Sequence, residues 1–130
     1  MVGLVIVSHS WKIAEGVKDL AMQMAPDYQG IIAAGGLEDG EIGTDPMKIM
    51  DAIRQADSGD GVVVLADLGS GIMSAETAIE FLEDEGIQVK IADAPIVEGA
   101  IVAAVEADGG SDFDTVLRVT ESTRGESKLS

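Results

Sequence analysis

The chain has 130 residues, no cysteine and a formal net charge of −16, from 24 acidic and 8 basic residues. Without cysteine it can form neither a disulfide framework nor a thiolate or zinc-thiolate site. So acidic a surface repels phosphate backbones, and we therefore expect no nucleic-acid partner. The charge would steer a basic protein surface towards the chain, but it does not by itself identify a partner.

The N-terminal segment MVGLVIVSHS has no basic residue before a short apolar run. It predicts neither a signal peptide nor a membrane span. Together with the missing cysteine, this favours a cytoplasmic protein.

The first half of the chain alternates strand and helix patterns. The branched apolar run from Gly3 to Val7 predicts a buried strand, and the helix after it ends at Pro26. The expected apolar face of that helix is Ile13, Val17, Leu20, Ala21 and Met24. A second strand from Gly30 to Ala34 leads into a glycine-rich loop, Gly35 to Asp45, and Pro46 marks the start of a second helix. The apolar stripe of the second helix is Ile49, Ala52, Ile53 and Ala56.

The second half continues the alternation. The run from Gly61 to Ala66 is apolar at nearly every position, which predicts a strand buried on both faces of a parallel sheet. The helix after it ends at Gly86, and its expected apolar face is Ile72, Ala75, Ile79 and Leu82. A fourth strand is expected from Ile87 to Ala92 and an alanine-rich helix from Ile96 to Ala107. Val116 to Thr120 alternates weakly, which fits either a short edge strand or the tail of a helix.

This order of elements predicts an α/β fold, an open, doubly wound parallel sheet with helices on both faces. The commonest small topology has the strand order 2-1-3-4, here with room for a short extra edge strand near the C-terminus. We expect a single domain over residues 1–124 and a polar tail over residues 125–130.

His9, the only histidine, lies just past the first strand, and Asp67 lies just past the third. In the expected order these strands are neighbours whose connections leave in opposite directions, so a crevice opens at their carboxyl ends. An imidazole is a nucleophile at neutral pH when its other nitrogen keeps the proton, and a carboxylate fixes that tautomer. We therefore predict that His9 and Asp67 form a catalytic pair and that the nucleophile accepts a phosphoryl group.

Helix starts and glycine turns around this crevice offer N–H and hydroxyl donors to an anion. The residues predicted to cradle phosphate are Ser10, Gly36, Thr44, Gly69, Ser70 and Gly71. Trp11, beside the nucleophile, is either an anchor for partner docking or a partly buried residue.

Each feature also has a purely structural interpretation. A lone histidine or aspartate at a helix start is often a cap, and a glycine-rich loop is often only flexible. We expect no metal site, because one histidine without cysteine would need clustered carboxylates. There is no Walker lysine and no Gly-x-Ser-x-Gly elbow, and a receiver domain would carry acidic residues where His9 stands.

Three segments are distinctive in their order and spacing: Gly3 to Ser10, Ala34 to Asp45 and Ala66 to Gly71. Together they resemble the mannose-type IIA domains of the bacterial phosphotransferase system, and in particular the IIA-like phosphotransfer subunits of phosphoenolpyruvate-dependent dihydroxyacetone kinases. The resemblance implies a phosphotransferase in which His9 takes the phosphoryl group from phosphohistidine on the carrier HPr and passes it to ADP bound to a kinase subunit. It implies no cofactor of the chain's own, an orienting role for Asp67, transfer through Nε2 and a homodimer.

The acceptor is open at this point. Mannose-specific relatives usually have glycine after the histidine, and Ser10 in that place favours the dihydroxyacetone branch. The alternatives are a IIA component of sugar transport and a non-catalytic regulatory module that binds a basic partner. A small-molecule or nucleotide-binding domain is a third alternative.

Overall fold

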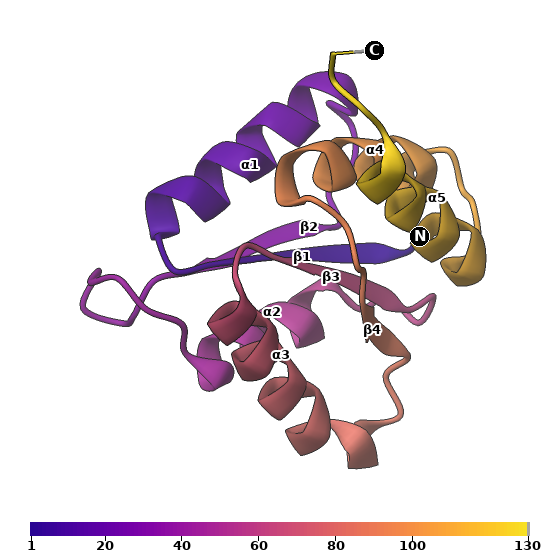
Figure 1. The fold of residues 1–130 in the computed structure, drawn as a ribbon. Coiled ribbons are helices and arrows are strands. Elements are labelled where there is room, and N and C mark those ends of the chain that lie inside the picture. The colour runs from indigo at the N-terminus through magenta and orange to yellow at the C-terminus, as the bar shows by residue number, and fades with distance from the viewer. Residues whose placement is uncertain (130) are drawn as a thin grey trace.

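The computed structural model describes residues 1–129, which form one four-stranded parallel sheet between two layers of helices (Figure 1). The strands are β1 (Gly3–Ser8), β2 (Ile31–Gly35), β3 (Val62–Ala66) and β4 (Val89–Ile91). The helices are α1 (Trp11–Met24), α2 (Pro46–Ala56), α3 (Gly69–Phe81), α4 (Ile96–Asp108) and α5 (Phe113–Ser122), with 3₁₀ turns at Glu83–Glu85 and Thr123–Gly125. The strand order β2-β1-β3-β4 confirms the predicted doubly wound topology.

The two central strands carry the core on both of their faces. All six residues of β1 and four of the five in β3 are buried. Side chains of β1 alternate between two apolar clusters, with Leu4 and Ile6 in one and Val5 and Val7 in the other. Helices α1, α4 and α5 cover the first cluster, while α2 and α3 cover the second (Figure 1). Because both faces of these two strands are buried, nearly every position in them has to be apolar, as predicted.

The C-terminal segment is helical, so of the two alternatives left open by the sequence the helix is confirmed and the edge strand is wrong. Residues 116–120 lie inside α5, whose buried positions include Phe113, Val116 and Thr120. Their spacing of three and four residues is helical, and Asp112 caps the helix by accepting a hydrogen bond from the Thr115 N–H at 2.9 Å. Over five residues, a weak alternation did not separate the two periods.

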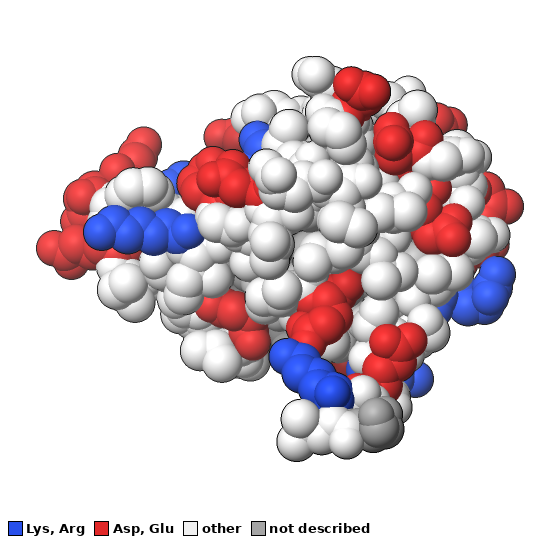
Figure 2. Space-filling view, turned by 90° about the horizontal axis from the view of Figure 1, so that it is seen from above, with Lys and Arg blue, Asp and Glu red and all other residues white. Residues whose placement is uncertain are grey.

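The apolar face of α1 is rotated from the predicted one. Val17 and Ala21 are buried together with Ala14, but Ile13, Leu20 and Met24 are about half exposed. The cause is a close approach between helix and sheet, since a Cβ atom on Gly35 would lie 2.7 Å from the Ala14 Cβ. Viewed from the side of α1, α4 and α5, charged groups surround a central area with few charges (Figure 2).

The other predicted helix faces agree better with the structure. The predicted stripe of α2 is buried at all four positions, behind an Asp45 cap and Pro46. In α3, Ala75 is buried, but Ile72 is exposed.

Strand β4 is shorter than the predicted strand, and Gly86 ends the preceding turn with a positive φ. Within residues 1–129, none of the helices has both the length and the apolar character that a membrane crossing needs.

We predict that Gly3→Ala strongly destabilises the protein, because the added Cβ would lie 2.1 Å from the Ala56 carbonyl oxygen, a backbone atom that cannot step aside. The expected loss in the free energy of unfolding is about 2–3 kcal/mol, measured by urea denaturation. Gly16→Ala is the matched control. It lies in α1 with no atom within 4 Å of its Cβ, and a gain of about 0.5–1 kcal/mol is expected there. Equal effects of the two substitutions would contradict this account.

Candidate active site

The sheet brings the carboxyl ends of β1 and β3 together. Val7 is the register partner of Ala66, and the Asp67 N–H donates to the Val7 carbonyl at 3.1 Å. The residue after each strand therefore lies at the same edge of the sheet, and His9 meets Asp67 there. The predicted convergence of these two side chains is confirmed.

The Asp67 carboxylate is the hub of the site and accepts four hydrogen bonds. Oδ1 accepts from His9 Nδ1 at 3.0 Å and from the Leu68 N–H at 2.8 Å. Oδ2 accepts from the Ser8 hydroxyl at 2.8 Å and from the His9 N–H at 3.0 Å. The carboxylate thus ties both strand ends and the histidine ring into one rigid unit.

The ionisation of Asp67 sets the tautomer of the ring. Burial raises the pKa of this carboxyl, but the hydrogen bonds from His9, Ser8 and Leu68 outweigh it and hold the pKa below its usual value. Asp67 is therefore ionised at neutral pH and can only accept hydrogen bonds. Nδ1 of His9 must then carry the proton, which leaves the lone pair of the neutral ring on Nε2.

Nε2 points at the start of α3. The Ser70 hydroxyl lies 2.5 Å from it, and Leu68, the N-cap residue, makes no side-chain capping bond. The first N–H groups of this helix are thus not taken by a cap, as an anion-binding helix start requires. A Cβ on Gly71 would lie 3.1 Å from Asp67 Oδ1, so glycine allows the helix to approach this closely. The predicted Gly69-Ser70-Gly71 turn is therefore adjacent to the nucleophile.

The other predicted cradle residues hold the site together through bonds within the protein. The Ser10 hydroxyl caps α1 by accepting from the Ile13 N–H at 3.3 Å. The Gly36 N–H donates to the Ser8 carbonyl at 3.1 Å, and the Thr44 hydroxyl lies 2.6 Å from that of Ser74. For these three residues a direct contact with phosphate stays a prediction.

Sequence reasoning missed Ser8 and Ser74. Ser8 is buried at the end of β1, and its hydroxyl holds Asp67. A polar residue that ends an otherwise apolar strand, next to the histidine, was the available signal. Ser74 lies one helical turn after Ser70, on the same face of α3. That spacing was visible in the sequence.

The glycine-rich loop reaches the rim of the site, as predicted. The Gly43 N–H donates to the His9 carbonyl at 2.8 Å, which fastens the end of the loop to the nucleophile's own backbone. Between Gly36 and Gly43 the loop projects away from the sheet (Figure 1). Its exposed carboxylates are Glu38, Asp39 and Glu41.

The reactive edge is open and bordered by apolar side chains. The His9 side chain is 21% exposed, and Trp11, Ile42 and Leu68 beside it are 47%, 71% and 63% exposed. Lys12 lies over the indole of Trp11, with Nζ 5.8 Å from the ring centroid. Trp11 is thus half exposed at the rim, a position from which it can contact a second protein.

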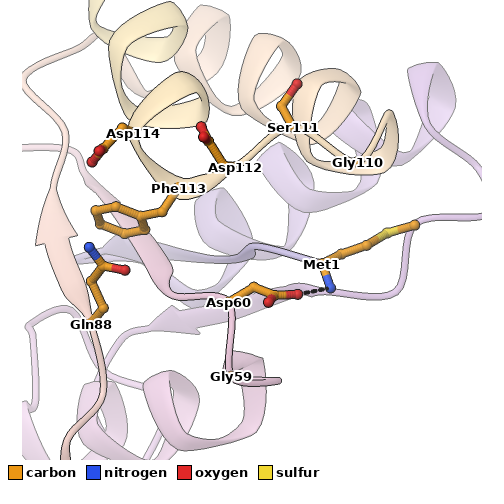
Figure 3. A pocket seen from close by; sticks show the side chains of 9 residues that line it. All are labelled: Met1, Gly59, Asp60, Gln88, Gly110, Ser111, Asp112, Phe113 and Asp114. Atoms are coloured by element: carbon orange, nitrogen blue, oxygen red, sulfur yellow. Dashed lines mark hydrogen bonds and ion pairs between the residues drawn. The ribbon is translucent and has the colours of Figure 1, made fainter.

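A hollow of about 540 Å³ lies at the opposite end of the strands (Figure 3). The N-terminal amine of Met1 pairs with Asp60 there at 2.6 Å, and the ring of Phe113 forms one wall. Asp112 and Asp114 add two more carboxylates to the lining. Three carboxylates repel a phosphate-bearing nucleotide, so this hollow gives no support to a nucleotide-binding domain.

Comparisons with known proteins point in one direction. The family model described as the fructose IIA component of the phosphotransferase system matches residues 3–117. The phosphoryl donor subunit DhaM of the PEP-dependent dihydroxyacetone kinase of Escherichia coli (strain K12) is 46% identical over 121 residues, which are 90% of this chain and 26% of that protein. DhaM of PEP-dependent dihydroxyacetone kinase 2 of Listeria innocua is 43% identical over 119 residues, 91% of this chain and 95% of that protein.

Among solved structures, the crystal structure of the unknown-function protein EF1359 matches with a TM-score of 0.84 and 36% identity, covering 99% of this chain and 98% of that one. The chain spans about a quarter of the length of the Escherichia coli relative and nearly the whole of the Listeria relative. Because the family model covers most of the sequence, the chain belongs to the family of the fructose IIA component of the phosphotransferase system.

Proposed function

We propose that this chain is a phosphoryl carrier in which His9 takes a phosphoryl group from phosphohistidine on a donor protein and passes it to ADP on a dihydroxyacetone kinase subunit. The observation that carries the proposal is the position of the ring. Nδ1 is held by Asp67, and Nε2 faces Ser70 and the uncapped start of α3. The names of the Escherichia coli and Listeria relatives support the acceptor.

In the first transfer, the Nε2 lone pair attacks phosphorus while the bond between phosphorus and the donor's ring nitrogen breaks. The donor ring leaves with that electron pair as a neutral imidazole. The His9 ring then carries a proton on Nδ1 and phosphorus on Nε2, and the positive charge of this ring is neutralised by Asp67 at 3.0 Å. In the second transfer, a terminal phosphate oxygen of ADP attacks, the Nε2–phosphorus bond breaks, and ATP leaves.

The groups beside Nε2 suit the phosphoryl oxygens. A helix N-terminus attracts anions through its free N–H groups and its dipole. Gly69 and Ser70 provide such N–H groups in the first turn of α3. The Ser70 hydroxyl, which faces Nε2 in the unmodified protein, would turn to donate to a phosphoryl oxygen.

The surroundings of His9 suit a protein donor. Exposed apolar residues follow His9 and Asp67 closely in the chain, and the loop between Gly36 and Gly43, which is fastened to the His9 backbone, carries exposed carboxylates. We therefore propose a donor with an apolar surface around its own phosphohistidine and a basic rim, which fits HPr. A cytoplasmic location and a homodimer belong to the same proposal.

The second candidate is a IIA component of sugar transport, favoured by the description of the family model. Both candidates use the same His9 chemistry and differ only in the acceptor. Adding the subunits of dihydroxyacetone kinase to the phosphorylated protein separates them. ATP formation from ADP identifies the kinase branch, whereas transfer only to a sugar-specific membrane component identifies the other.

We predict that phosphoenolpyruvate, enzyme I and HPr label this protein with acid-labile, base-stable phosphate, and that His9→Gln abolishes the labelling. Intact mass spectrometry measures the added phosphoryl group. Circular dichroism controls for folding of the variant. A His9→Gln protein that is folded and still labelled would exclude the carrier mechanism and leave the non-catalytic module.

We predict that Asp67→Asn slows labelling by roughly 100-fold or more, because an amide no longer enforces the Nδ1–H tautomer or neutralises the phosphorylated ring. Rapid-quench kinetics measure the rate, and nitrogen NMR of the ring reports the tautomer. A changed tautomer with an unchanged rate would remove the orienting role.

Asp67→Asn also changes stability in a pH-dependent way. The folded pKa of Asp67 lies below its unfolded value of about 3.9, so its ionisation stabilises the fold at higher pH. The excess stability of the natural protein over Asp67→Asn should hold from pH 7 to about pH 4 and then shrink as the pH falls through the folded pKa. Urea denaturation at several pH values measures this gap. A gap that persists at the lowest pH would show that ionisation is not its source.

We predict that replacing Glu38, Asp39 and Glu41 together by their amides slows transfer from HPr at low salt by about tenfold and weakens its dependence on salt. The control replaces Glu83, Asp84 and Glu126, which are also exposed, and so changes the net charge equally. An equal effect of the two triple variants would show that overall charge, and not the loop, attracts the donor.

A further inference from the structure

Lys48 is a cation at the same end of the sheet as His9. It lies in the first turn of α2 and is half-buried, and its Nζ donates to the Gly35 carbonyl at 2.9 Å. Across residues 1–129, no carboxylate forms an ion pair with it within 4.0 Å. Arg54, Arg124 and Lys128 all have such a partner. The charge of Lys48 is therefore held in place by a backbone carbonyl and not cancelled by a contacting carboxylate.

Gly35, whose carbonyl holds Lys48, is packed against the residues on either side of His9. Gly35 is the register partner of Ser8 in the β1–β2 pair. A Cβ on Gly35 would lie 2.6 Å from the Ser10 carbonyl oxygen. Nζ lies one hydrogen bond from the end of β2, and neighbouring strands are roughly 4.8 Å apart. The ammonium is therefore on the order of 10 Å from the end of β1, the strand that leads into His9.

A phosphoryl group on His9 needs positive charge nearby. Phosphorylation adds roughly −1.5 to −2 charges at neutral pH. The chain already has a net charge of −16, and Asp67 contacts the ring that would carry the group. The start of α3 offers only about half a positive charge. Lys12, the other cation near this rim, lies over the exposed indole of Trp11. Lys48 is the cation bound to the floor of the site.

We propose that Lys48 stabilises the phosphorylated form of His9 through its electric field, without touching the phosphoryl group. This inference rests on the proposed function. A unit charge about 10 Å from a near-dianion changes the stability of the phosphorylated state by about five- to tenfold at dielectric constants between those of protein and water.

The test is a competition for phosphoryl groups at equilibrium. Equal amounts of the natural protein and Lys48→Met are mixed with catalytic amounts of enzyme I and HPr and with half as much phosphoenolpyruvate as total acceptor protein, so that the two chains compete for a limited number of phosphoryl groups. The two chains differ in mass, so intact mass spectrometry gives the phosphorylated fraction of each. Because the shared donor only shuttles phosphate, the ratio reports the stability of phosphohistidine and is independent of docking rates. We expect the natural protein to be favoured by about five- to tenfold.

Three variants make the result specific to charge. Lys48→Arg should compete equally with the natural protein, because it keeps the cation. Lys48→Gln retains a donor for the Gly35 carbonyl but no charge, so its phosphorylated fraction should fall below that of the natural protein as far as that of Lys48→Met does. If Lys48→Met does not fold, the result with Lys48→Gln is used instead. Lys90→Met, on exposed β4, alters net charge equally and should compete equally.

The outcomes separate the two proposals. Equal partition between the natural protein and Lys48→Gln would overturn the role of Lys48 and leave the carrier function intact. A shift of the same size with Lys90→Met would also overturn it, since net charge alone would then suffice. No labelling of the natural protein would instead contradict the proposed function itself.

Discussion

The site depends on one partly buried carboxylate, that of Asp67. A charge removed from water is costly unless hydrogen bonds replace its solvation, and Asp67 obtains four of them from groups at the ends of β1 and β3. Three of these donors belong to Ser8 and His9, so the carboxylate can be satisfied only if β1 and β3 are neighbours in register. The hydrogen bonds that replace the solvation of the Asp67 carboxylate also fix the orientation of the His9 ring. Stability and chemistry thus impose the same constraint on this strand pair.

That constraint explains why the sequence predicts the catalytic pair so directly. Both residues follow strands that are apolar apart from Ser8 at the end of β1, and the strand order follows from the alternation of strands and helices. The contact between Nε2 and Ser70 could not be assigned in the same way, because it depends on how closely α3 approaches the ring. That approach is possible because Gly71 has no Cβ beside Asp67. A glycine in a sequence can indicate a close approach of this kind, but it does not identify the residue that is approached.

The errors have physical causes of the same kind. Three of the five residues on the predicted face of α1 are about half exposed, because Ala14 and Gly35 are small and let the helix pack closely against β2. Periodicity identifies an apolar face but not its exact centre when alanines can substitute for larger side chains. For residues 116–120 the sequence left both an edge strand and a helix open, because a short, weakly patterned segment fits two periods. Its Asp112 cap is a local signal that would have decided between them.

A carrier must hold its phosphoryl group firmly enough to accept it and loosely enough to give it up, and the geometry suits this compromise. The Gly36 N–H already donates within the protein, and the Thr44 hydroxyl is already paired with that of Ser74, so few groups are left to bind the phosphoryl oxygens. In the proposed carrier, Asp67 would neutralise the ring and not the phosphoryl group, which would favour the bond to Nε2 but leave phosphorus open to the next nucleophile. A field from Lys48 would act in the same way, because charge at a distance lowers the energy of the phosphorylated state without enclosing it. A site that bound the phosphoryl group through many hydrogen bonds would oppose its transfer to an acceptor, and this open edge of the sheet offers few such bonds.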